Sequence, residues 1–169
     1  MNKDIKNLIE DIVNFNPVDY SDDELIDKNT LDNILQIPKN KNDLSDIIRK
    51  RINENKFGDR NLVFPDLSNI DTSYITDMSS LFADIINNRK IKLDLSKWNT
   101  SNVTNMSFMF NDCMGICELN LSGWDTSNVI NMASMFTGCL SLTKLDLTSF
   151  DISNVTNISS MFDECKSLR

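Results

Sequence analysis

The apolar positions in the second part of the chain repeat with a period of 26 residues. From Phe64 onward, the same residue types return at the same place in successive units. The clearest columns are Leu95, Leu121 and Leu147; Trp98, Trp124 and Phe150; Val103, Val129 and Val155; and Phe110, Phe136 and Phe162. An earlier copy, two residues longer, begins with Ile70, Ile75 and Phe82. A period of this size is typical of stacked coils, and four units can be counted, the fourth incomplete.

Two shorter periods alternate within each unit. Apolar and polar residues alternate in 119–121 and 145–147, which predicts a short strand with one face inward. Apolar residues then recur at spacings of three and four, which predicts a short helix with Ser127 and Asn128 as candidate caps. The residues with helical spacing in one unit are Val129, Met132, Met135, Phe136 and Cys139.

Residues 1–58 lack the 26-residue period and predict an all-helical segment. Residues 3–15 form an amphipathic pattern, and short helices are expected up to Pro38. The strongest helix is predicted over 42–57, with Gly58 as its stop and an apolar face that covers the open end of the first coil. That apolar face consists of Leu44, Ile47, Ile48 and Ile52. For residues 1–37, a structural role and a partner-binding or oligomerising role both remain open.

The repeated unit has a recognisable residue pattern. Residues 119–142 read Leu-x-Leu-Ser-x-Trp-Asp-Thr-Ser-Asn-Val-x-Asn-Met-x-x-Met-Phe-x-x-Cys-x-x-Leu. This unit resembles the BspA-type leucine-rich repeat, also called the mycoplasma-type or DUF285 repeat, over residues 60–169. The helix at 39–57 is similar to the N-terminal cap that often precedes such repeats.

The resemblance implies an α/β fold with two parts. These are a helical segment over residues 1–58 and, over 59–169, a leucine-rich-repeat-like solenoid of about four 26-residue coils with short parallel strands. It also implies a habit of binding proteins, and relatives are commonly secreted or surface-anchored adhesins.

Composition excludes several classes of function. The chain of 169 residues contains no histidine, so Ser-His and Cys-His nucleophiles and histidine-ligated metals are ruled out. We expect no catalytic residues, cofactor or metal. The net charge of −8 argues against direct nucleic-acid binding and is compatible with a basic protein partner. The N-terminus does not resemble a signal peptide and no apolar run is long enough to span a membrane, which predicts a cytoplasmic protein with reduced cysteines.

Several columns suggest chemistry but are better explained by structure. The spacing of Cys113, Cys139 and Cys165 does not suit zinc, so packing thiols are favoured over metal or redox chemistry. Polar side chains at the strand-to-helix corner are expected to bond to the backbone of their own turn. The corner residues are Asp71, Asn99, Asp125 and Asp151, followed by Asn102, Asn128 and Asn154. The methionine columns and the tryptophans are assigned to the core.

The exposed strand face is the candidate binding surface. Its side chains lie between the inward leucines, are mixed in charge and are mostly acidic at the centre. Phe64 is the residue to test first, because an exposed aromatic is a common interface anchor. The predicted partner-binding residues are Phe64, Asp66, Lys92, Asp94, Glu118, Asn120, Lys144 and Asp146.

Three functions remain open at this stage. A non-catalytic protein-interaction module is favoured. The alternatives are an intracellular inhibitor that docks an acidic surface on a basic, nucleic-acid-handling enzyme and a fragment of a bacterial surface adhesin. The sequence stops at Arg169, where a further strand would begin, so the predicted strand at 145–147 would have one unpaired edge. Truncation, a partner or second copy on that edge, and shielding by the last helix are alternative explanations.

Overall fold

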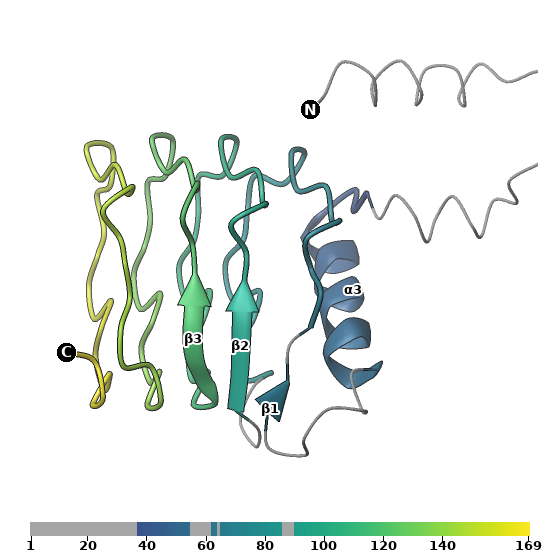
Figure 1. The fold of residues 1–169 in the computed structure, drawn as a ribbon. Coiled ribbons are helices and arrows are strands. Elements are labelled where there is room, and N and C mark those ends of the chain that lie inside the picture. Colours follow the sequence, from purple (N-terminus) through teal and green to yellow (C-terminus); the bar gives the residue numbers. More distant parts are fainter. Residues whose placement is uncertain (1–36, 55–61, 64, 86–89) are drawn as a thin grey trace, which may run out of the picture. The chain divides into compact units, whose positions relative to one another are not determined.

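The structure is a computed structural model that describes residues 37–54, 62–63, 65–85 and 90–169. The chain divides into two compact units, Met1–Asn33 and Ile34–Arg169, and every described residue belongs to the second. Its elements are α3 (Lys41–Glu54), β1 (Leu62–Val63), β2 (Lys90–Asp94) and β3 (Ile116–Asn120), drawn in Figure 1. The helices predicted before residue 37, the stop at Gly58 and the anchor Phe64 lie outside the described residues.

Helix α3 begins with an asparagine cap. The Asn40 side-chain oxygen accepts hydrogen bonds from the backbone N–H groups of Asn42 and Asp43, at 2.8 and 3.0 Å. This cap satisfies two of the N–H groups that the first turn of a helix leaves unpaired. The helix therefore starts one residue before the predicted Asn42. Its predicted apolar face is confirmed, because Leu44, Ile48 and Ile52 are buried and Ile47 is partly buried.

The three strands form a parallel sheet in the order β1-β2-β3. In β2, Ile91 and Leu93 are buried, Lys92 between them is partly buried, and Lys90 and Asp94 are exposed, which is the alternation expected of a strand with one face on the core. The strand expected at residues 145–147 is not found. No backbone hydrogen bond joins these described residues to β3, and Leu145 and Leu147 are only partly buried.

Each repeat continues into a stretch that we call its turn segment, at residues 77–85, 105–113, 131–139 and 157–165. The helix predicted here is wrong. In residues 131–139, the N–H groups of Met135, Thr137 and Cys139 bond three residues back, each at 3.2 Å, whereas the alternate N–H groups point to the next repeat. Left-handed residues, such as Ser134 with φ 54°, interrupt any helix. The apolar spacing of three and four therefore comes from successive tight turns.

The turn segments of neighbouring repeats are joined by ladders of backbone hydrogen bonds. Every second residue donates its N–H to a carbonyl of the following repeat, at 2.8 to 3.2 Å. The donors are Met78, Ser80, Phe82 and Asp84 in the first ladder; Met106, Phe108, Phe110 and Asp112 in the second; and Met132, Ser134, Phe136 and Gly138 in the third. Parallel bridges between Asp77, Asn105, Asn131 and Asn157 mark the same register. The repeats therefore lie side by side in sequence order (Figure 1).

The core is continuous through the repeats and is built from stacked side chains. The rings of Phe82, Phe110, Phe136 and Phe162 stack at centroid distances of 5.1, 5.6 and 5.5 Å. The core roles predicted for tryptophan and methionine are confirmed, since the two indoles are 2% exposed and five of the six methionines in these columns are fully buried. These buried residues are Trp98, Trp124, Met78, Met106, Met109, Met132 and Met135.

Candidate interaction surface

The exposed face of the sheet carries polar side chains that pair across neighbouring strands. Lys92 lies opposite Glu118, and Asp94 lies opposite Asn120. The Lys92 ammonium is 2.5 Å from a carboxylate oxygen of Glu118. This hydrogen bond raises the pKa of Lys92 above its usual value. The Asn120 amide donates to the Asp94 carboxylate at 3.1 Å. The structure thus brings four of the predicted residues together as two adjacent pairs.

Four polar side chains of the strand face each accept a hydrogen bond from the backbone N–H of the residue two positions later. These are Asp66, Asp94, Asn120 and Asp146. The Asp94 carboxylate accepts the N–H of Ser96 at 3.0 Å, and the Asn120 oxygen accepts that of Ser122 at 3.1 Å. Asp66 and Asp146 make the same contact with Ser68 and Thr148, and also accept their hydroxyl groups at 2.7 Å. These are Asx turns, which fix the direction of the carboxylate. The face therefore presents a column of oriented acceptors.

The hydrogen bonds of these turns also keep the carboxylates ionised. The N–H and hydroxyl of Ser68 lower the pKa of Asp66, and those of Thr148 lower the pKa of Asp146. Hydrogen bonds from Ser96 likewise lower the pKa of Asp94. All three side chains are exposed. Lys144, the remaining predicted residue that the structure describes, is also exposed and lies two residues before Asp146 in the sequence.

The residues at the corner after the strand have structural contacts. Asp71, Asn99, Asp125 and Asp151 each accept the N–H of the serine two residues later, at 2.8 to 3.1 Å, as predicted. The neighbouring asparagines were predicted to bond to the backbone of their own turn, and this prediction is wrong. Asn102, Asn128 and Asn154 donate to the carbonyls of Ser73, Ser101 and Ser127 in the preceding repeat, because the parallel register places those carbonyls within reach.

A third Asx column, missed by the sequence analysis, lies at the start of the turn segments. Asp77, Asn105, Asn131 and Asn157 each accept the N–H of the residue two positions later, at 2.8 to 3.1 Å. Only its first member is charged.

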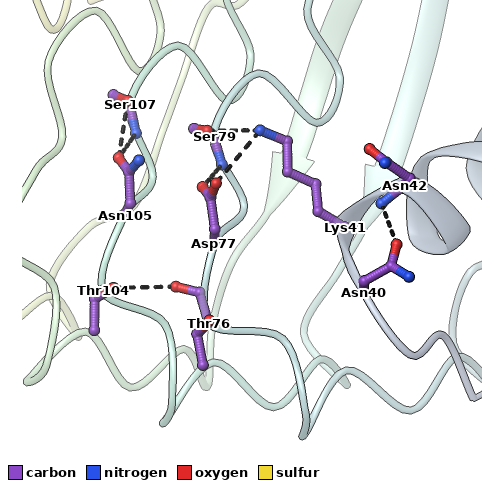
Figure 2. A network of polar contacts seen from close by, with 9 residues as sticks. All are labelled: Asn40, Lys41, Asn42, Thr76, Asp77, Ser79, Thr104, Asn105 and Ser107. Atoms are coloured by element: carbon purple, nitrogen blue, oxygen red, sulfur yellow. Dashed lines mark hydrogen bonds and ion pairs between the residues drawn. The ribbon is translucent and has the colours of Figure 1, made fainter.

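A lysine of α3 contacts that charged member. The Lys41 ammonium lies 3.6 Å from the Asp77 carboxylate and donates to the Ser79 hydroxyl at 2.7 Å (Figure 2). Burial alone would raise the pKa of Asp77, but hydrogen bonds from Ser79 and the Lys41 charge together lower it. In the sequence, Asp77 stands where the other three repeats have asparagine. This difference was the signal from which a charged partner for the position could have been predicted.

The cysteine column contributes to the core. The thiols of Cys113, Cys139 and Cys165 donate to the carbonyls of Phe82, Phe110 and Phe136, at 3.0 to 3.3 Å. Burial raises the pKa of Cys139 to about 12 and raises that of Cys113 further. A protonated thiol is a poor nucleophile and a poor metal ligand. Among the described residues, no group of three histidine, cysteine or acidic side chains could hold a metal ion.

Comparison with known protein families identifies the family to which the chain belongs. A family model described as "Mycoplasma protein of unknown function, DUF285" matches residues 52–169, which is more than half of the sequence. The chain belongs to the DUF285 family. This finding confirms the resemblance that the repeated unit suggested. No curated protein and no solved structure matches the chain.

The DUF285 match covers the candidate surface but not all of α3. It includes every residue predicted to bind a partner, from Phe64 to Asp146, and begins at Ile52, near the end of the helix. Lys41 and the capping residue of the helix, Asn40, therefore precede the region that the family model matches. No helix in the described ranges of this DUF285 chain is long and apolar enough to cross a membrane.

Proposed function

We propose that this DUF285 chain is a non-catalytic protein-interaction module with a leucine-rich-repeat-like solenoid fold of about four coils. The parallel strand order and the three backbone ladders support stacked coils. One observation carries the functional part. The cross-strand pairs Lys92–Glu118 and Asp94–Asn120 hold polar groups in fixed positions on the side of the sheet that faces away from the core. A preoriented polar surface costs less entropy to bind than a mobile one.

A basic protein surface is the partner chemistry that fits best. Asp66, Asp94 and Asp146 are exposed, their pKa values are lowered, and their carboxylates are held in one direction by the serine or threonine that follows. Charge complementarity of this kind contributes to specificity and to the rate of association. In this proposal the chain acts only by binding its partner, and no residue of the chain takes part in a chemical step.

The decisive experiment reverses one charge on the strand face. We expect Glu118→Lys to remove the ion pair with Lys92 and to place two cations opposite each other, which reduces binding of a basic partner at least tenfold, or about 1.4 kcal/mol. The full-length protein would serve as bait in an extract of its source, and the affinity of the purified partner would then be measured by calorimetry over a series of salt concentrations.

Asp163→Lys is the matched control, because it makes the same charge change at an exposed position in a turn segment. This variant should bind like the wild type. Equal loss in both variants would show that only net charge matters, and no loss in either would rule out the strand face. Affinity that does not change with salt would exclude the basic partner, because screening weakens interactions between exposed charges.

A further inference from the structure

One phenylalanine occupies a position at which the other repeats have a small polar residue. Phe108 belongs to the turn segment of repeat two and has a φ of 58°. The equivalent residues are Ser80, Ser134 and Ser160, with φ values of 53 to 56°. The fold therefore imposes a left-handed backbone at this place in every repeat. Among the described residues, Phe108 is the only aromatic one with a positive φ.

Neither backbone geometry nor packing explains a phenylalanine at this position. A left-handed backbone costs free energy in any residue with a side chain, and it is least unfavourable for asparagine and aspartate. Phe108 is also 45% exposed, whereas Phe110 is fully buried. This exposure does not come from an end of the stack, because repeats one and three are both hydrogen-bonded to repeat two. Backbone outliers of this kind are concentrated at functional sites.

The backbone of Phe108 is held on both sides and its neighbours in the column are small. Its N–H donates to the Ala133 carbonyl at 2.9 Å, and its carbonyl accepts the Asn111 N–H at 3.0 Å. The adjacent residues of the column are Ser80, which is exposed, and Ser134, which is partly buried. The aromatic side chain is thus larger than its flanking residues and is attached to a fixed backbone. Such a preoriented aromatic is suited to anchor an interface.

A second column of left-handed residues lies beside the first. Four positions after each member of the first column come Asp84, Asp112 and Gly138, with φ values of 59, 53 and 73°. Their N–H groups also donate to the next repeat, so the two columns run in parallel along the stack. Gly138 leaves room for the Asp112 carboxylate, which a Cβ atom at that position would overlap. Asp84 is exposed and Asp112 is partly exposed.

The surface around Phe108 is acidic. The turn segments of repeats one to three contain three aspartates and no lysine or arginine. Asp77 is bound to Lys41, whereas no ion pair joins Asp84 or Asp112 to another described residue. We call the surface formed by Phe108, its two serine neighbours and these last two aspartates the ladder face. A partner that complements this face needs positive charge beside an apolar surface.

We propose that the ladder face binds an amphipathic helix of another protein that carries an apolar stripe beside a basic stripe. Two parallel stripes on a helix match the two parallel columns of the face. Hydrogen-bonded neighbouring segments lie about 4.8 Å apart and a helix rises about 5.4 Å per turn, so successive turns of the helix meet successive repeats. Phe108 enters the hole between apolar side chains of the helix, and basic residues one turn apart face Asp84 and Asp112. This site is separate from the strand face and does not depend on it.

The test uses a defined peptide as the partner helix. The probe contains the sequence Leu-Lys-Lys-Leu-Leu-Lys-Leu twice, which gives a helix with a leucine stripe flanked by lysines. When it is titrated into the ¹⁵N-labelled full-length chain, we expect saturable shifts of the Phe108 and Asp112 amide signals. Peptides with serine in place of leucine, or glutamate in place of lysine, should not produce these shifts. The proposal is overturned if the leucine–lysine peptide does not bind, or if it shifts only signals of the strand face.

A variant of Phe108 separates a binding role from a structural one. Phe108→Ser restores the residue of the other repeats, so it should weaken peptide binding at least tenfold, or about 1.4 kcal/mol, without lowering the midpoint of urea unfolding. Tyr74→Asn is the matched control. It removes an aromatic side chain that is 65% exposed in repeat one, and it likewise restores the asparagine of the other repeats. This control should bind like the wild type, and equal affinity of Phe108→Ser and the wild type would refute the proposal.

Two further variants test the charge and the location. Asp84→Asn combined with Asp112→Asn keeps side chains that tolerate a left-handed backbone. This double variant should bind the peptide more weakly and with less dependence on salt, because two exposed charges are removed. Glu118→Lys changes the strand face and should leave the shift of the Phe108 signal intact. If Glu118→Lys abolishes binding while the double variant binds normally, the peptide occupies the strand face and the ladder face is excluded.

Discussion

At the scale of the residue, the most frequent motif is an aspartate or asparagine that is bonded to the serine or threonine two positions later. It occurs at the end of the strand, at the corner and at the start of the turn segment. The sequence alone was enough to predict its structural role at the corner, because short polar side chains in turns bond locally. The partners of Asn102 and Asn128 could not be predicted in this way, because those carbonyls are 29 and 27 residues away.

This motif lowers the pKa of its aspartate, and the shift can be measured at Asp125. Asp125 accepts the Ser127 hydroxyl at 2.6 Å and its N–H at 3.0 Å, and these two bonds lower the pKa of Asp125. We expect Ser127→Ala to raise that pKa toward the ordinary value, because only the N–H bond remains. A ¹³C NMR titration of the carboxyl groups measures the change. An unchanged pKa in the variant would show that the hydroxyl bond does not persist in solution.

The lowered pKa of such an aspartate also determines how the stability of the fold changes with pH. A carboxyl whose pKa is lower in the folded state than in the unfolded state stabilises the fold at pH values above its unfolded pKa. That contribution disappears as the pH falls through the lowered value. The wild-type chain should therefore lose stability below about pH 4, the ordinary range of aspartate, and Ser127→Ala should show a slightly smaller loss.

At the scale of the element, the attachment of α3 can be tested through Lys41. Its contact with Asp77 and Ser79 is partly exposed, so we expect Lys41→Ala to lower the free energy of unfolding by about 0.5 to 1 kcal/mol. Asp77→Asn restores the asparagine of the other repeats, keeps a group that can accept the Ser79 N–H, and should cost less. Urea unfolding of both single variants and the double variant gives the coupling energy. Strict additivity would mean that the ion pair contributes nothing.

The turn segments show where pattern reading fails. Their apolar residues recur at spacings of three and four, as in a helix, because each tight turn also brings residues three apart together. What decides between the two structures is the destination of the alternate N–H groups. In the turn segments they bond to the next repeat, and helical periodicity contains no information about that contact. The left-handed conformation of Ser80, Phe108, Ser134 and Ser160 is likewise invisible in residues that are not glycine.

At the scale of the whole molecule, the period of 26 residues was sufficient to predict which residues share a column and which columns are buried. It was also sufficient to place Lys92 beside Glu118 and Asp94 beside Asn120 on one face. It did not predict the Lys41 contact, which joins residues outside the repeat to the first turn segment. The strand expected at residues 145–147 was wrong, since these described residues make no backbone hydrogen bond to β3.

Equivalent phenylalanines should differ in their contribution to stability according to their place in the stack. Phe136 is fully buried between two rings, whereas Phe162 has one ring neighbour and is 41% exposed. We expect Phe136→Ala to destabilise the chain by about 3–5 kcal/mol, the usual cost of removing a buried phenylalanine, and Phe162→Ala by roughly a third of that. Chemical denaturation of the two variants provides the comparison. Equal costs would mean that Phe162 is covered in solution.

The one-way direction of the ladders gives the stack an electrical polarity. Each peptide group in a ladder points its N–H toward the later repeat and its C=O toward the earlier one, so the dipoles of four columns add along the stack, as they do in a helix. The positive ends of these dipoles point toward repeat four, where the acidic residues Asp163 and Glu164 are found. The partial negative pole lies at repeat one, where the Lys41 ammonium is held. The charged side chains of these two repeats thus complement the field of the backbone.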